Sequence, residues 1–176
     1  MTNLPWWLRV TDQSLTYYEV KVLGEPAPWA VYTRRGAPSA NFLACQVWQE
    51  QIRAAVIEKY GRPMLMGPVT LEAVFHRTLR NPPKTAAAYQ RRCLAEIVRP
   101  PDVTNLTKAA EDALKGVLIK DDGQVIKVTG QKRFVPQGGK PWTWLAVAVV
   151  DPRWLETSAL EETECGGELP NSGVLE

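Results

Sequence analysis

Cysteine and histidine, the residues that most often bind zinc, are scarce in this sequence. The chain of 176 residues includes three cysteines and one histidine, and neither kind is spaced as zinc ligands are. This scarcity argues against a structural zinc site. The three cysteines are scattered and odd in number, which indicates reduced thiols. We therefore expect a cytoplasmic protein.

Long hydrophobic runs and glycine-rich phosphate-binding loops are also missing. Their absence argues against a membrane protein and against a nucleotide cofactor. Hydrophobic residues still make up 45% of the chain and include seven tryptophans, as in a folded globular protein. We expect one domain over residues 16–150, an N-terminal extension over residues 1–15, and an acidic, disordered tail over residues 151–176.

The charge of the chain is small in total, at +2, but unevenly distributed. Residues 151–176 hold seven acidic residues and one arginine, a net charge of −6, which leaves +8 on residues 1–150. Such a positive excess favours a polyanionic partner, although simple solvated charge is the alternative. The candidate contacts lie in a basic loop over residues 24–38 and a partly helical basic arm over residues 77–99; they are Arg34, Arg35, Arg91 and Arg92.

The periodicity of apolar residues predicts the secondary structure. Apolar positions recur at helical spacing and at alternating, strand-like spacing in separate parts of the chain. The pattern predicts an α+β fold, with a small mixed sheet of about four strands and two main helices packed on it. The predicted helices cover residues 41–59 and 104–115, and the predicted strands cover residues 17–23, 69–76, 125–129 and 142–150.

Residues 100–133 gather several oxygen-bearing side chains around a helix, a turn and a strand. Asp102 stands before the predicted helix, Glu111 on its polar side, and Asp121 and Asp122 in a turn that follows. Carboxylates suit a hard divalent cation, and Lys108 on the same polar side suits a phosphate. Taken singly, Asp102 is also explained as a helix cap and the aspartate pair as a solvated turn.

The same stretch resembles a known family. The segments PDVTNLTK, residues 101–108, and EDALKGVLIKDDGQV, residues 111–125, are similar to the central motif of the RusA-type Holliday-junction resolvases, small endonucleases often carried by phages. The similarity extends over about residues 16–150. The positions in register with the family motif are Pro101, Asp102, Asn105, Lys108, Asp112, Ala113, Leu114, Gly116, Asp121, Asp122 and Gln124.

The resemblance implies a homodimeric endonuclease in a bacterium or phage-infected host, acting on four-way DNA junctions by paired, symmetric cleavage. It implies Mg²⁺ as cofactor, with Mn²⁺ as a substitute. Asp102 and Asp122 are then the expected metal ligands, with Asp121 and Glu111 as second choices. Lys108 is expected to neutralise charge on the phosphate.

One position departs from the family pattern. The usual second aspartate, two residues after the first, is Thr104 here, which replaces an anionic ligand with a weak neutral one. We consider Glu111 the candidate replacement, because it lies two helical turns further along the same side. The alternatives are a branched-DNA binding protein with weakened catalysis, or a nuclease selective for flaps or forks.

Overall fold

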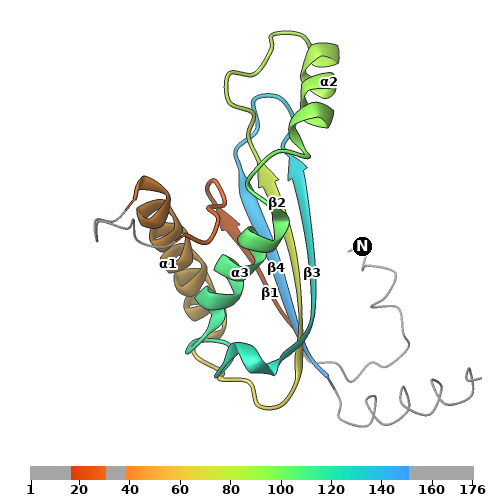
Figure 1. The fold of residues 1–176 in the computed structure, drawn as a ribbon. Coiled ribbons are helices and arrows are strands. Elements are labelled where there is room, and N and C mark those ends of the chain that lie inside the picture. The colour runs from red at the N-terminus through yellow and green to blue at the C-terminus, as the bar shows by residue number, and fades with distance from the viewer. Residues whose placement is uncertain (1–16, 31–38, 151–176) are drawn as a thin grey trace, which may run out of the picture.

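A computed structural model describes residues 17–30 and 39–150 (Figure 1). The predictions for Arg34, Arg35, the N-terminal extension and the acidic tail lie outside these residues. The elements in chain order are β1 (Tyr17–Leu23), α1 (Ala40–Tyr60), β2 (Val69–Arg77), α2 (Ala86–Glu96), α3 (Val103–Leu114), a short 3-10 turn η2 (Asp122–Gln124), β3 (Val125–Phe134) and β4 (Trp142–Val149).

The four strands form one mixed sheet in the order β1-β4-β2-β3. β4 pairs antiparallel with both β1 and β2, whereas β2 and β3 run parallel. A parallel pair requires a long crossover connection, and here α2 and α3 form it. β4 is apolar on both faces because it lies inside the sheet, as its sequence predicts. The α+β prediction is confirmed.

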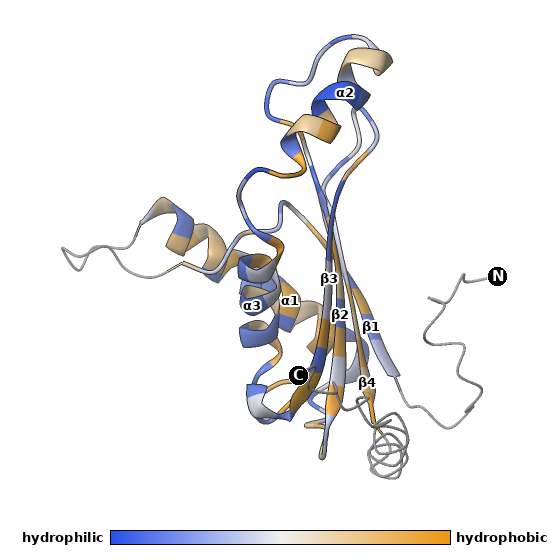
Figure 2. Cartoon of the chain, turned by 45° about the vertical axis from the view of Figure 1, so that its right-hand side comes forward, coloured by the Kyte–Doolittle hydropathy of each residue, from blue (hydrophilic) through white to orange (hydrophobic). Residues whose placement is uncertain are grey.

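The helices α1 and α3 cover one face of the sheet (Figure 2). α1 buries Cys45, Trp48, Ile52 and Val56, and β2 buries every second residue from Val69. Burial of these side chains supplies the main stabilisation of the fold. No helix in the described ranges is long and apolar enough to cross a membrane. From α3 the core receives Leu106, Ala109, Ala110, Ala113 and Leu114, the stripe that helical periodicity predicts.

The basic arm projects beyond the sheet as α2 and its flanking loops (Figure 1). α2 begins after Thr85, whose side chain accepts a hydrogen bond from the Ala88 amide. The buried Tyr89 hydroxyl donates to the Val135 carbonyl at 2.7 Å and so ties the helix to the chain that leaves β3. The arm is thus an ordered, partly helical element, as the sequence predicts.

β3 is twice as long as the five residues predicted from alternation, because tertiary pairing extends it. Nine positions of β3 pair with β2, from Val125 opposite Val69 to Phe134 opposite Arg77. β3 lies at the edge of the sheet, and its residues 126–131 are exposed. An edge strand needs no alternation of apolar and polar residues, which explains why the sequence pattern ended early.

α3 packs directly against β3 at Gly130. A Cβ atom at this glycine would lie 2.6 Å from Thr107 Oγ1 and 2.9 Å from Val103 Cγ2. The Thr107 hydroxyl also donates to the Val103 carbonyl at 2.7 Å, so it cannot turn away without losing that bond. Contact between the helix and the edge strand therefore requires glycine at this position.

Gly130→Ala is expected to lower the free energy of unfolding by about 1–3 kcal/mol, because the added methyl group pushes α3 off β3. Urea denaturation monitored by circular dichroism measures the change. Gly123→Ala is the matched control, since a Cβ at Gly123 would meet nothing within 4 Å. Equal stability of the two variants would contradict the close contact.

Candidate active site

Asp102 stands at the start of α3, in an extended conformation with φ −68° and ψ 147°. It occupies the N-cap position that the sequence predicts, but its side chain makes no capping hydrogen bond. The carboxylate is exposed, and it lies near enough to Lys132 to raise the pKa of that amine. Burial and the neighbouring Arg77 act more strongly on Lys132 and lower its pKa overall.

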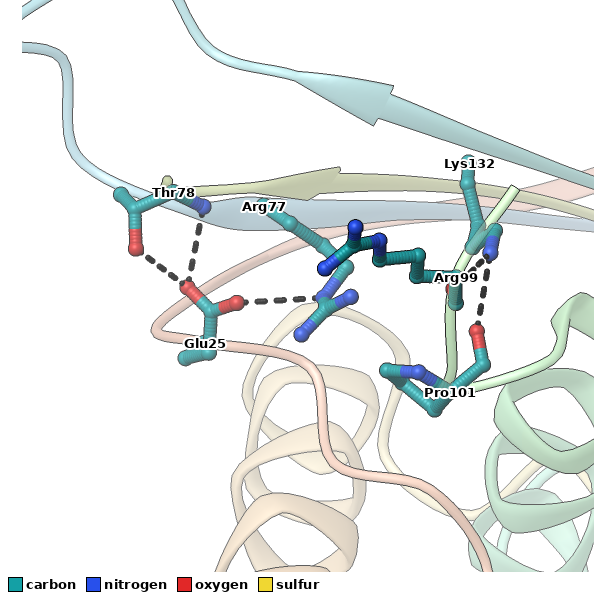
Figure 3. A network of polar contacts seen from close by, with 6 residues as sticks. All are labelled: Glu25, Arg77, Thr78, Arg99, Pro101 and Lys132. Atoms are coloured by element: carbon teal, nitrogen blue, oxygen red, sulfur yellow. Dashed lines mark hydrogen bonds and ion pairs between the residues drawn. The ribbon is translucent and has the colours of Figure 1, made fainter. Parts of the chain in front are cut away.

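Two groups of hydrogen bonds hold this end of the site in place (Figure 3). The Lys132 ammonium donates to the carbonyls of Arg99 at 2.9 Å and Pro101 at 3.0 Å, which ties β3 to the residues before α3. Nearby, the Glu25 carboxylate accepts hydrogen bonds from Arg77 Nε at 3.2 Å and from the Thr78 hydroxyl at 2.9 Å. The loop after β1 is thereby fixed to the end of β2.

The acidic turn lies at the other end of α3. Gly116, with φ +73°, lets the chain turn back after the helix. Asp121 then caps the 3-10 turn η2. Lys115 reaches this turn from the end of α3: its Nζ lies 3.0 Å from Asp122 Oδ2 and 3.9 Å from Asp121 Oδ1. The local sequence around Lys115 does not predict this contact, because a lysine at the end of a helix is most often solvated.

The charges near the acidic turn influence one another. A hydrogen bond with Asp121 and another from Lys115 lower the pKa of Asp122 to about 2. Partial burial raises the pKa of Glu111, and the neighbouring Asp122 raises it further, against a smaller opposing effect of Lys108. Glu111 and Asp122 are thus close enough to repel each other, and a cation near both would relieve the repulsion.

Lys108, the predicted phosphate-binding residue, lies on the exposed side of α3. Its Nζ is 5.4 Å from the centre of the Trp29 ring, a cation–π contact. The Trp29 amide donates to the Asn105 carbonyl at 2.9 Å, so the loop after β1 is anchored on α3. Trp29 was not among the predicted site residues, because nothing in its local sequence signals a contact with a helix about 80 residues away.

The structure brings together only part of the predicted metal site. Glu111, Asp121 and Asp122 lie near the C-terminal end of α3, with Lys115 among them. Asp102 is the N-cap at the other end of α3, about 14 Å from Glu111 along the helix axis. Thr104 is exposed on the first turn.

The donor chemistry fits Mg²⁺ in one of its usual modes. The described part of the chain holds no group of three or more His, Cys, Asp or Glu side chains placed to share a metal ion. Mg²⁺ commonly takes one or two protein carboxylates and fills its remaining positions with water and phosphate oxygens. The repelling pair Glu111 and Asp122 suits that mode, whereas Asp102 of the same chain is too far away to join them.

The two predicted DNA-contacting arginines that are described lie on α2, away from the acidic turn (Figure 1). Arg91 is exposed. Arg92 donates to the Asn81 carbonyl at 2.7 Å and has Glu96 within 3.9 Å, so part of its function is to brace the arm.

Lys115→Met is expected to raise the pKa of Asp122 from about 2 toward the ordinary value of 3.8, because it removes a hydrogen bond and a positive charge. The pKa of Glu111 rises as well, since Lys115 also lowers it. Titration by NMR of the side-chain carboxyl carbons, without divalent metal, measures both. Lys120→Met removes the same charge from a neighbouring exposed position and is expected to change neither by a comparable amount. An unchanged pKa of Asp122 in Lys115→Met would contradict the ion pair.

Comparison with known proteins identifies the family. Residues 31–139 match the family model for endodeoxyribonuclease RusA, a span that includes α1, β2, the arm, α3, the acidic turn and β3. No curated protein gives a significant match. The matched span is more than half of the chain and contains all four predicted metal-ligand candidates. The chain therefore belongs to the RusA family of endodeoxyribonucleases, whose general activity is the resolution of Holliday junctions.

Proposed function

We propose that this protein is a Mg²⁺-dependent endonuclease that resolves four-way DNA junctions by paired, symmetric hydrolysis of two phosphodiester bonds. The observation that carries the proposal is the pair of repelling carboxylates, Glu111 and Asp122. Lys108 on α3 and Lys115 at its C-terminal end flank them. Anionic oxygens suit the metal, and the adjacent ammonium groups suit the DNA phosphate.

In the proposed mechanism, each side chain has a distinct task. Mg²⁺, or Mn²⁺ in its place, supplies an activated water and charge neutralisation when it is bound. Glu111 and Asp122 would hold the metal, with Asp121, the neighbouring carboxylate of the turn, as a further ligand. Lys108 donates to the scissile phosphate and stabilises the charge that develops there. Contact with the Trp29 ring restricts the positions that the Lys108 ammonium can occupy.

The separation of Asp102 from Asp122 supports a homodimer whose sites are shared between chains. β3 begins just after the acidic turn and reaches Lys132, beside Asp102, near its end. Among the described strands, β3 pairs only with β2, which leaves its outer edge available. Antiparallel pairing of two β3 strands about a two-fold axis would place the acidic end of each against the basic end of the other. Asp102 of one chain would then approach Asp122 of its partner.

Cleavage of a synthetic four-way junction in Mg²⁺, but not in EDTA, is the first expected result. Asp102→Asn and Asp122→Asn are each expected to slow cleavage by more than about 100-fold, since a lost ligand costs at least as much as a lost supporting residue. Junction affinity should stay within a few fold, because it comes from the basic surface.

Heterodimers of Asp102→Asn with Asp122→Asn, purified through two different tags, test the shared site. A shared site leaves one of the two centres with both aspartates intact, so the heterodimer nicks one strand of the junction. A site within one chain leaves both centres defective, and the heterodimer stays inactive. Tight junction binding by the wild-type protein without cleavage in Mg²⁺ or Mn²⁺ would instead support the DNA-binding alternative, to which the threonine at position 104 points. Preferential cutting of flaps or forks would favour the third alternative.

We further propose that the basic arm binds the phosphate backbone of the junction. Arg91 is exposed on α2, and Arg80, Lys84 and Arg99 lie in the loops that flank it. Glu96 is the single acidic residue between Arg77 and Arg99. An arm with this excess of positive charge attracts DNA and releases counterions on binding.

Junction affinity is expected to fall by about 1,000-fold or more between 50 and 200 mM salt, through counterion release. Arg91→Ala is expected to reduce the slope of log affinity against log salt by about one. Lys21→Ala, on the strand at the opposite edge of the sheet, serves as the charge-matched control and is expected to leave the slope unchanged. Fluorescence anisotropy in EDTA measures the affinity without cleavage. An affinity that does not depend on salt would contradict DNA binding through this arm.

A further inference from the structure

The side chain of Gln124 joins the acidic turn to a distant part of the chain. Its Oε1 accepts hydrogen bonds from the amides of Lys120 at 2.7 Å and Asp121 at 3.0 Å. Its Nε2 donates to the carbonyls of Leu65 and Gly67, each at 2.9 Å. A primary amide offers two donors and two acceptor sites, so Gln124 uses its full hydrogen-bonding capacity.

The carbonyls that receive these bonds belong to a firmly held segment, the connection between α1 and β2. Leu65 is buried, with 7% of its surface exposed, and packs in the hydrophobic core. Its amide donates to the Leu118 carbonyl at 2.7 Å. Leu65 also forms a β-bridge with Ile119, which is fully buried. Through Leu65, Gln124 therefore attaches the turn to the core, and its second acceptor, the Gly67 carbonyl, lies in the exposed part of the same connection.

The turn has few other restraints. Asp121 and Gly123 are exposed, and η2 buries none of its residues. The ion pair from Lys115 restrains the aspartate side chains, but the lysine side chain is 38% exposed, and such exposed ion pairs hold weakly. Gln124 links the backbone amides of Lys120 and Asp121 directly to the carbonyls of Leu65 and Gly67.

We propose that Gln124 is a positioning residue, which sets the place of Asp121 and Asp122 opposite Glu111 by fastening the acidic turn to Leu65 and Gly67. The inference rests on the proposed function, because it assumes that these carboxylates bind the metal. Carboxylates that must share a cation with Glu111 have to be held within a small range of positions. Residues that orient metal ligands in this way typically contribute about 10–100-fold in metal affinity or activity.

The test compares two variants in the full-length protein. Gln124→Leu keeps a side chain of similar bulk and removes all four hydrogen bonds. Gln124→Asn keeps the amide but is one methylene shorter, so it cannot span from the turn to Leu65 and Gly67. Mg²⁺ affinity is measured without DNA by isothermal titration calorimetry, and hydrogen exchange is measured at the amides of Lys120 and Asp121.

Gln137→Leu is the matched control. The Gln137 amide also bridges two carbonyls of a distant segment, those of Pro83 at 2.8 Å and Lys84 at 3.2 Å. Gln137 lies in the connection between β3 and β4 and joins it to the arm, and that end of the sheet is away from the acidic turn (Figure 1). If both glutamine variants lose stability but only the Gln124 variant loses Mg²⁺ affinity, the loss of affinity is due to the acidic turn and not to lower stability.

Gln124→Leu is expected to weaken Mg²⁺ binding by about 10–100-fold and to speed exchange at Lys120 and Asp121. The Mg²⁺ affinity of Gln124→Asn is expected to lie between that of Gln124→Leu and that of the wild type. If the leucine variant does not fold, the asparagine variant alone provides the test. Gln137→Leu is expected to keep wild-type Mg²⁺ affinity. Wild-type affinity in both Gln124 variants, with exchange accelerated, would overturn the inference and leave the proposed metal site standing. A wild-type protein that binds no Mg²⁺ would overturn the proposed metal site and this inference with it.

Discussion

Parallel pairing of β2 with β3 is the constraint on which the rest of the structure depends. A parallel pair cannot be joined by a tight turn, so the chain that leaves the end of β2 must return to the start of β3. The arm and α3 make that return, and α3 consequently runs opposite to the strands it covers. Gly130 allows the helix to approach the edge strand closely. The direction of α3 places Asp102 near Lys132, toward the end of β3. It places the acidic turn just before the start of β3.

This arrangement gives each end of α3 a different electrostatic character. At one end Asp122 raises the pKa of Glu111, and Asp121 and Lys115 lower the pKa of Asp122. At the other end the exposed Asp102 has Lys132 and Arg99 nearby. Repulsion among carboxylates costs stability unless a cation is present, and proteins retain such clusters where a cation is used. The acidic end therefore suits the proposed metal ion, and the basic end suits the proposed anionic partner.

The opposite charges of the two ends bear on the proposed pairing of two chains. β3 follows the acidic turn and carries Lys132 and Arg133 near its end, so the proposed antiparallel pairing of two β3 strands would set opposite charges against each other. A two-fold arrangement of identical sites suits a four-way junction, which presents two equivalent strands for cleavage. The family to which the chain belongs, the charges at the two ends of β3 and the position of β3 at the edge of the described sheet thus support one consistent proposal.

The amino-acid sequence by itself determined the elements and the family. The apolar stripe of α3, the alternation of β2 and the two apolar faces of β4 depend on local periodicity, which burial on one or both faces imposes directly. The sequence motif around Asp102 and Asp122 likewise indicated the family without the structure. Only the tertiary structure decided that Asp102 lies a full helix away from the acidic turn, that Lys115 contacts Asp122, that Trp29 lies under Lys108 and that Gln124 reaches Leu65 and Gly67. These contacts join residues whose positions are set by the path of the chain between them, and a pattern of neighbouring residues contains no information about that path.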